Sequence, residues 1–477
     1  MHDAPDRDGR QLHIAVVGGG ASGTLTAVQL LRQAAMRELP LRITLIDAAG
    51  RHGLGQAYST SCPDHLLNAM AGQMSALPDD HDHLIRWAAA SGAVDGLVTK
   101  TTFLPRQVYG QYLRDTLAAA EQLASSRSRL TRISAEVVAI RPNRTGPALR
   151  LFLSVGHLDA DVVVLATGNA PAQLPFDAPR TSRIITDPWR PGGLTGADDG
   201  SPVVIVGTGL TMLDLAVAIT GASPRTTIHA VSRHGLLPRP HSGSSPAAPK
   251  PMWLPVVARS TGQVRLRELM WQVRSVIAAN PASWQTVMES LRPIVPGLWR
   301  RMPTGDKRLF LRHVARYWEV HRHLVPPPTA SRIAELRCTG RLSVHHGRVV
   351  RVTEDGNRLR VLLDTGSEAI ELTAGWLINA TGAGTDIAVA ASPLLRDLFT
   401  TGLARPDPLG LGIDASAQGA VLDTTGLPSD VLYTLGPPLR GLWYETTAIP
   451  EIREQAAALA RRITGDRQLS RRPGSAA

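Results

Sequence analysis

Cysteine is scarce in this chain of 477 residues, which contains only Cys62 and Cys338. The two cysteines are far apart and do not form a C-x-x-C pair, so the sequence excludes a disulfide-reductase active site and a cysteine zinc site. A cysteine content this low is typical of a reducing compartment. The sequence also lacks a run approaching the roughly twenty apolar residues of a membrane span, and residues 1–11 contain no apolar signal region. We therefore expect a cytoplasmic protein without a membrane partner.

Lysine is nearly absent as well. Only Lys100, Lys250 and Lys307 occur, so the net charge of +11 comes almost entirely from arginine. The arginines are spread along the chain, whereas nucleic-acid-binding proteins gather positive charge on one face. We therefore expect no nucleic acid as partner, while an anionic small-molecule substrate fits this charge. A hydrophobic content of 43% and a charged content of 19% indicate a globular protein, long enough for about two or three domains.

The strongest motif lies near the N-terminus. An apolar, β-branched run at 12–17 is typical of a buried parallel strand. It leads directly into the G-x-G-x-x-G sequence at 18–23, and residues 24–31 then have a helical pattern. A second strand is expected at 41–46, and it ends on Asp47. Strand, turn, helix, strand and acid in this order form the dinucleotide-binding fingerprint; the alternative is a βαβ unit with a purely structural role.

Each residue of this fingerprint has a physical role. Gly18 allows the tight turn from strand to helix, Gly20 lets a pyrophosphate approach the backbone, and Gly23 lets the helix pack close to the strand. The unpaired N–H groups at the helix start, including those of Ala21 and Ser22, face the phosphates. Asp47 would accept hydrogen bonds from the ribose hydroxyls of the adenosine.

A second, degenerate copy of the motif begins after a predicted strand at 202–206. Gly207 and Gly209 form the turn with Thr211 close behind, but Met212 stands where the third glycine would be. The succession of strand, glycine turn and helix again favours a nucleotide bound at the start of the helix.

The strand that follows this second copy indicates which nicotinamide cofactor binds. It covers 227–231 and ends on Ser232 and Arg233, not on an acid. An acid would repel a ribose 2′-phosphate, whereas Ser232 and Arg233 can bind one. We therefore expect NADPH in preference to NADH; the alternative is that Arg233 is simply an exposed arginine.

Two stretches of the chain echo each other. Short strands within 136–165 lead to an A-T-G turn that contains Thr167 and Gly168, and short strands within 343–379 lead to a second A-T-G turn that ends at Gly382. We expect the turns to mark the two crossings between a flavin domain and a nicotinamide domain. The predicted fold class is α/β, with two Rossmann-like dinucleotide-binding domains and a helical insertion.

These crossings suggest where the domains divide. We expect a first part of the FAD-binding domain at 1–195 and its second part at 336–477. An NAD(P)-binding domain at 196–335 lies between them and contains a helical insertion at about 252–325.

Nine motifs occur in a fixed order along the chain. They are G-x-G-x-x-G at 18–23, G-x-G-x-A-Y-S-T at 53–60, H-L-L-N at 65–68, P-R-x-x-Y-G-x-Y-L at 105–113, A-T-G at 166–168, G-T-G-L-T-x-x-D at 207–214, S-R-x-G-x-x-P-R at 232–239, A-T-G at 380–382 and E-x-x-A-x-P-E-I-R at 445–453. As a set, this order resembles the bacterial FAD/NAD(P)-binding family that includes the FAD-dependent urate hydroxylases, over roughly residues 12–460.

The resemblance implies which residues hold the cofactors. FAD would lie at Gly18, Gly20, Gly23 and Asp47, with Asn68 and the region 436–448 near the flavin, and the nicotinamide at Gly207, Gly209 and Arg233. The chain departs from many two-dinucleotide flavoproteins at Pro437, which follows Gly436 where an aspartate would bind the ribityl chain. The F-x-G-x-x-x-H fingerprint of Baeyer–Villiger and flavin-containing monooxygenases is absent between the two glycine motifs.

Four polar residues are candidates for the surroundings of the flavin: Tyr58, Asn68, Arg106 and Glu445. Arg106 would hold an anionic substrate or the FAD phosphates, or else form a salt bridge at the start of a helix. The complete set of predicted cofactor contacts is Gly18, Gly20, Ala21, Ser22, Gly23, Asp47, Tyr58, Asn68, Arg106, Thr167, Gly168, Gly207, Gly209, Thr211, Ser232, Arg233, Gly382, Gly436, Glu445 and Ala448.

The leading hypothesis for function is an FAD-dependent, NAD(P)H-consuming monooxygenase that uses molecular oxygen to hydroxylate a small polar substrate. In such enzymes the cofactors carry the redox chemistry and the protein supplies placement and a dry pocket. One alternative is a reductase or dehydrogenase without oxygen insertion, and another is a non-catalytic FAD/NAD(P)-binding protein. No residue is an evident general base. His321 and His323 have no carboxylate partner at a suitable spacing, so we expect no metal site.

Overall fold

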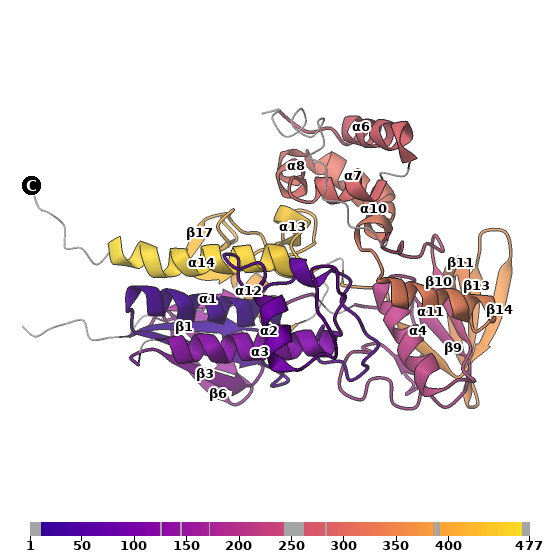
Figure 1. Cartoon of the computed structure of the whole chain (residues 1–477), viewed down its shortest axis with the longest axis horizontal. Helices are drawn as coiled ribbons and strands as arrows, with labels where there is room; N and C mark the ends of the chain where they lie inside the picture. The colour runs from indigo at the N-terminus through magenta and orange to yellow at the C-terminus, as the bar shows by residue number, and fades with distance from the viewer. Residues whose placement is uncertain are drawn as a thin grey trace, which may run out of the picture.

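The computed structural model describes residues 11–124, 126–143, 146–170, 172–242, 262–281, 284–384, 387 and 392–469, with the side chains of these residues up to 465. Two units, each built around a β-sheet, lie side by side, and a group of helices projects above the region between them (Figure 1). None of the described helices is long and apolar enough to cross a bilayer.

The first unit contains a six-stranded sheet with the order β16-β17-β7-β1-β2-β3, in which only β16 is antiparallel to its neighbour. Its strands are β1 (Leu12–Val17), β2 (Leu41–Asp47), β3 (Arg129–Ser134), β7 (Val162–Leu165), β16 (Ala420–Leu422) and β17 (Pro428–Thr434). The helices are α1 (Ala21–Arg37), α2 (His83–Ser91), α3 (Arg106–Leu123), α12 (Pro393–Thr401), α13 (Arg440–Trp443) and α14 (Ile449–Leu469), with short 3₁₀ turns at Ala71–Gln73 and Pro437–Leu439.

Both faces of this sheet are covered, which explains why β1 is an uninterrupted apolar run. Ile14 and Val16 pack against α1, α3 and α14. Ala15 and Val17 face the other way and pack against α12 and a small antiparallel sheet. That sheet consists of β4 (Val137–Pro142), β5 (Leu149–Leu153) and β6 (Gly156–Ala160).

The second unit contains a parallel sheet with the order β11-β10-β9-β15-β8. Helices α4 and α11 cover one face, and a three-stranded antiparallel sheet covers the other. The bounds are β8 (Ile184–Ile185), β9 (Val203–Val206), α4 (Leu210–Ala222), β10 (Ile228–Ser232), α11 (Pro327–Cys338), β11 (Leu342–His346), β12 (Arg348–Asp355), β13 (Arg358–Asp364), β14 (Ala369–Ala374) and β15 (Trp376–Asn379).

This topology confirms the α/β class with two Rossmann-like units, but the second sheet does not end where the predicted boundary at 335/336 places it. Strand β11 pairs with β10, and β15 pairs with β9 in the centre of the sheet. The chain therefore returns to the first unit only after Asn379. Strand β8, inside the range 1–195 expected for the FAD-binding domain, likewise forms the edge of the second sheet.

The projecting helices, which we call the helical lobe, lie between β10 and α11 in the sequence. They are α6 (Leu266–Ala279), α7 (Trp284–Leu291), α8 (Val295–Arg301), α9 (Thr304–Leu309) and α10 (Ala315–Arg322), with a π-helical turn at Phe310–Val314. These helices fall inside the predicted insertion, whose residues 252–261 lie outside the described residues. Figure 1 shows α6, α7, α8 and α10 standing apart from both sheets.

Candidate functional site

The two glycine turns have the same geometry. Gly18 has φ +110° and Gly207 has φ +118°, a conformation that favours glycine. A Cβ on Gly18 would lie 2.2 Å from the carbonyl oxygen of Ala166, and a Cβ on Gly207 would lie 2.1 Å from that of Ala380. Each of these alanines opens an A-T-G turn, so Thr167 and Gly168 adjoin the first glycine turn, as Thr381 and Gly382 adjoin the second. The two similar stretches therefore end at equivalent positions, each next to the first glycine of a glycine turn.

The helix that follows each turn has an uncapped N-terminus. Gly20 precedes α1 and Gly209 precedes α4; neither helix has a side-chain cap or an acidic residue in its first turn. The first N–H groups of an α-helix have no partner within the helix, and the helix dipole places partial positive charge at that end. Both sites can thus accept an anion such as a pyrophosphate.

The two turns differ in what covers them. A Cβ on Gly209 would meet no atom within 4 Å, whereas a Cβ on Gly20 would lie 3.4 Å from the Cα of Gly55. The loop at 51–58 lies across the first turn, and the N–H of Gly53 donates to the carbonyl of Gly19 at 2.8 Å. In this structure Gly55 makes a close approach to Gly20, and the approach of a pyrophosphate to the same backbone stays a prediction.

Gly23 has the packing role that its position predicts, since a Cβ there would lie 1.8 Å from the carbonyl oxygen of Gly18. Ser22 is buried in the first turn of α1, and a Cβ on Gly436 would lie 2.6 Å from its hydroxyl oxygen. Gly436 and the start of α1, including Ala21, are therefore neighbours, although they are far apart in the sequence.

Asp47 orders the first turn and the loop that covers it. Its carboxylate accepts hydrogen bonds from the N–H of Gly19 at 3.1 Å, of Ala49 at 3.0 Å and of Arg51 at 2.9 Å. A ribose contact by Asp47 stays a prediction; the contacts seen here give this acid a structural role as well.

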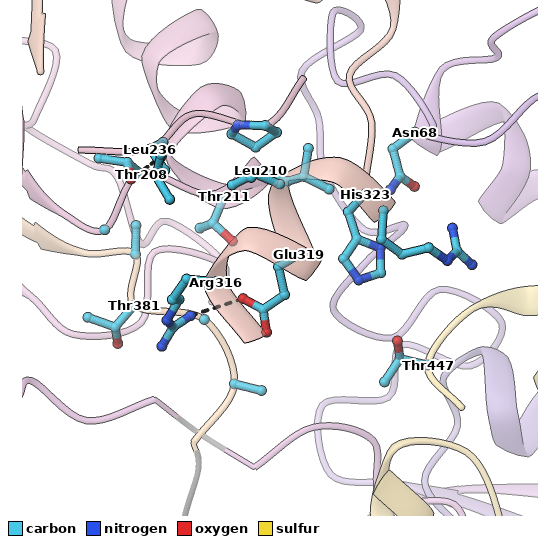
Figure 2. A pocket seen from close by; sticks show the side chains of 18 of the residues that line it. Asn68, Thr208, Leu210, Thr211, Leu236, Arg316, Glu319, His323, Thr381 and Thr447 are labelled. Carbon is cyan, nitrogen blue, oxygen red and sulfur yellow. Dashed lines mark hydrogen bonds and ion pairs between the residues drawn. The ribbon is translucent and has the colours of Figure 1, made fainter. Parts of the chain in front are cut away.

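A cavity of about 1270 Å³, which we call the interdomain cavity, lies between the two units and below the helical lobe. Figure 2 shows residues from all three parts around it: Asn68 and Thr447 from the first unit, Thr208 and Thr381 from the second, and Glu319 from the lobe. Eleven predicted contacts line it: Tyr58, Asn68, Arg106, Gly207, Gly209, Thr211, Ser232, Arg233, Gly382, Glu445 and Ala448. The start of α14 faces it through Thr447, Ala448, Ile449 and Pro450.

Arg106 connects the two units. It begins α3 in the first unit and forms a 2.7 Å ion pair with Asp214, a buried residue of α4 in the second unit. Its Nε donates to the carbonyl of Leu66, while the ring of His65 hydrogen-bonds the carbonyl oxygen of Asp214 at 2.9 Å. Among the roles that the sequence leaves open for Arg106, the structure shows the salt bridge.

Ser232 builds the end of β10. The Thr208 hydroxyl donates a hydrogen bond to the carbonyl of Leu236 at 2.6 Å. Because that hydroxyl has only one hydrogen, the Ser232 hydroxyl must donate to the Thr208 oxygen at 2.8 Å. The Ser232 oxygen also accepts from the N–H of Gly235 at 3.1 Å. No hydroxyl hydrogen of Ser232 is left for a phosphate in this arrangement.

Three arginines gather beside Ser232. Burial, and then the nearby charges of Arg316 and Arg348, lower the pKa of the Arg233 guanidinium. All three side chains line the interdomain cavity, and within the described part of the chain neither Arg233 nor Arg348 forms an ion pair. Arg348 begins β12, Arg316 lies in α10 and Arg233 follows β10. The fold therefore brings together three arginines that are far apart in the sequence.

Arg322 and His323 at the end of α10 are functional candidates that sequence reasoning missed, and they lie beside the predicted residue Glu445. Glu445 is buried and accepts a hydrogen bond from the Trp318 indole at 2.9 Å, and Arg322 lies 3.3 Å away. Burial raises the pKa of Glu445, but Arg322 and His323 outweigh this and lower it overall. Burial also lowers the pKa of His323, which lines the cavity. The run W-E-V-H-R-H at 318–323, whose histidines we considered only as metal ligands, was the available signal.

Comparisons with known proteins agree with this architecture. Residues 15–170 match the model of a family described as FAD-NAD(P)-binding. No curated protein matches the chain in sequence. Among solved structures, the ornithine N-hydroxylase of Kutzneria sp. 744, with reduced FAD, NADP⁺ and L-ornithine, has a TM-score of 0.63 at 14% identity, over 96% of this chain and 100% of that one.

Two further structures are similarly close. L-lysine 6-monooxygenase from Pseudomonas syringae has a TM-score of 0.62 at 15% identity, covering 94% of this chain and 98% of that one. An FAD-bound cadaverine monooxygenase from Erwinia amylovora has a TM-score of 0.62 at 11% identity, covering 96% and 95%. The chain thus has the fold of two-dinucleotide flavoproteins, and its residues 15–170 are similar to an FAD-NAD(P)-binding family.

Proposed function

We propose that the protein is an FAD-dependent, NADPH-consuming monooxygenase that hydroxylates a small substrate with a polar reacting group. The observation that carries this proposal is the repeated turn. Two glycine turns of equal geometry, each followed by an uncapped helix, lie at the carboxyl ends of the parallel strands β1 and β9. Dinucleotides bind at this position in open α/β sheets.

The residues of the first unit fit FAD. The start of α1 would hold its pyrophosphate beside Ser22 and Gly436, and Tyr58, Asn68 and the start of α14 would surround the flavin ring. We assign NADPH to the second unit, at Gly207, Gly209 and the three arginines. FAD held at these residues would supply the redox chemistry, the oxidation of NADPH and the reduction of molecular oxygen.

The similarity to N-hydroxylating enzymes favours oxygen insertion over a reductase or a non-catalytic role. The order of the motifs supports membership of the family that includes the FAD-dependent urate hydroxylases. The low cysteine content supports a cytoplasmic location. An anionic group on the substrate is part of this proposal and rests on the excess of arginine in the sequence, because Arg322 on the cavity wall is already paired with Glu445.

One experiment tests the proposed function directly. We expect the purified protein to be yellow, or to take up FAD when it is offered, and we expect NADPH to bleach this flavin under anaerobic conditions. Oxygen is then admitted with L-ornithine, L-lysine, cadaverine or urate, and hydroxylated product is compared with released peroxide. A colourless protein that refuses FAD would contradict the proposal. Complete release of peroxide with a wide substrate panel would favour the reductase.

The arginine group should decide between the two nicotinamide cofactors. We expect Arg233→Ala and Arg348→Ala each to raise the KM for NADPH about 10-fold or more, because a hydrogen bond to a charged phosphate is worth about 1.5–3 kcal/mol. The KM for NADH, which lacks the 2′-phosphate, should stay within about twofold. Arg312→Ala removes an exposed arginine outside the cavity and serves as the control. An equal rise for both cofactors would argue against a 2′-phosphate site.

A further inference from the structure

A second cavity lies inside the helical lobe. This lobe cavity has a volume of about 430 Å³, and its walls come from α6, α7, α8, the π-helical turn and α10. In Figure 1 these helices stand apart from both sheets. Among the described wall residues, Tyr444 comes from the first unit, where it follows α13. A cavity of about 150 Å³ with apolar walls already binds benzene, and ligand pockets usually measure about 300–1000 Å³. The lobe cavity is therefore large enough for a sizeable organic group.

The walls of the lobe cavity are almost wholly apolar. The aromatic members pack on one another, with ring centroids 4.7 Å apart for Trp299 and Tyr444 and 5.1 Å apart for Phe310 and Tyr444. The indole N–H groups of Trp299 and Trp318 are already used, by the carbonyl of Gly441 and by Glu445. The aliphatic wall includes Leu269, Met270, Val273, Val295 and Leu298. Such a surface offers a ligand burial and few hydrogen bonds.

The charged residues of this wall are all cationic. Arg239 and Arg274 line the lobe cavity and are exposed, and the described residues around it include no carboxylate. An apolar group that carries positive charge would be repelled here, whereas one that is neutral or joined to an anion would not.

The lobe cavity adjoins the interdomain cavity. Met288, His321 and Tyr444 line both of them, so the two spaces meet at these side chains. The His321 Nδ1 must donate to the carbonyl of Tyr317 at 2.7 Å, because a carbonyl can only accept. This bond orients the ring at the place where the two cavities meet. A molecule in the lobe cavity that extends past these three side chains would enter the interdomain cavity.

We propose that the lobe cavity binds an alkyl or aryl group of the substrate, whose polar reacting end lies in the interdomain cavity. This inference rests on the proposed function for the identity of the occupant as substrate. It adds a substrate class: an elongated molecule with an uncharged or anionic apolar arm. An apolar group would bind here because it covers apolar surface that the empty lobe cavity leaves open, and burying that surface is favourable.

Linear alkanoates from butanoate to decanoate are suitable probes for the full-length, FAD-loaded protein. We expect each added methylene to tighten binding about fourfold until the cavity is full, measured by calorimetry and by the fluorescence of Trp284, Trp299 and Trp318, which line the cavity. Alkylamines of equal length should bind at least about 10-fold more weakly because of the two arginines. Bound octanoate should also alter the visible spectrum of the flavin.

Variants of α6 provide the matched test. Val273→Trp fills the cavity and should weaken octanoate binding at least about 10-fold. Ser275→Trp adds the same side chain on the exposed side of α6, outside the cavity, and should leave binding unchanged. If Val273→Trp proves unstable, the smaller change Val273→Leu should give a graded loss with normal folding.

The outcomes separate this inference from the proposed function. The inference alone would be overturned if NADPH bleaches the bound flavin but alkanoate affinity does not depend on chain length. The same holds if NADPH bleaches the flavin and both tryptophan variants lose alkanoate affinity equally. Alkanoate binding without any change in the flavin spectrum would overturn the link to the substrate. Chain-length-dependent binding by a protein that refuses FAD would overturn the proposed function and confirm the apolar site.

Discussion

Gly209→Val should abolish NADPH binding and leave the fold intact. Gly209 has φ −81° and ψ −168°, which valine adopts readily, and an added Cβ would meet no protein atom within 4 Å. The side chain would instead occupy the space at the start of α4 where a pyrophosphate would lie. Because several hydrogen bonds to a charged group are lost together, we expect the dissociation constant to rise at least about 100-fold. Anaerobic titration of the flavin measures it.

The control for this variant lies in the same helix. Gly221→Val also adds a side chain that meets nothing within 4 Å, but near the opposite end of α4. It should bind NADPH normally. Gly207→Val would be uninformative, because its Cβ would lie 2.1 Å from the Ala380 carbonyl and disturb the sheet itself. A Gly209→Val protein with unchanged affinity would show that no nucleotide phosphate lies at this turn.

Asp214→Ala should cost about 3–5 kcal/mol in the free energy of unfolding, because it leaves the Arg106 charge buried without its partner. The side chains of Arg106 and Asp214 are only 17% and 9% exposed, and they join the two units. Burial raises the pKa of Asp214, and the charge of Arg106 opposes this rise, so the pair is itself costly to bury. Denaturant titration of the FAD-loaded protein measures the loss.

A double variant identifies the cause of that loss. Arg106→Leu combined with Asp214→Leu removes both charges, and it should recover most of the stability that either single change costs. Arg32→Ala, which breaks an ion pair with the exposed Asp79 within one unit, should cost no more than about 1 kcal/mol. If Asp214→Ala is equally mild, the interdomain pair is not a determinant of stability.

The glycine turns, and the strands that lead into them, could be predicted because their signals are local. A buried parallel strand is a continuous apolar run, and the turn behind it needs glycine at fixed offsets. The recurrence of A-T-G at 166–168 and 380–382 likewise gave the correct expectation of two equivalent turns, which the contacts of Gly18 and Gly207 confirm.

Features that depend on distant pairings could not be predicted. The boundary near 335 was wrong because β11 and β15 join the second sheet through pairings with β10 and β9 that no local pattern specifies. The same holds for the site. Arg348 joins Arg233 only because β12 follows β11 at the edge of the sheet, and Asp214 reaches Arg106 only because the two units meet.

The different covering of the two turns has a consequence for how each cofactor would exchange. Gly20 lies beneath Gly55, in a loop tied down by the Gly53 N–H and by Asp47, whereas Gly209 faces open space. A nucleotide at the first turn would have to displace an ordered loop to leave, so it should remain bound from one turnover to the next. A nucleotide at the second turn meets no such obstacle and can come and go with each cycle. One turn thus suits a resident prosthetic group, and the other a co-substrate.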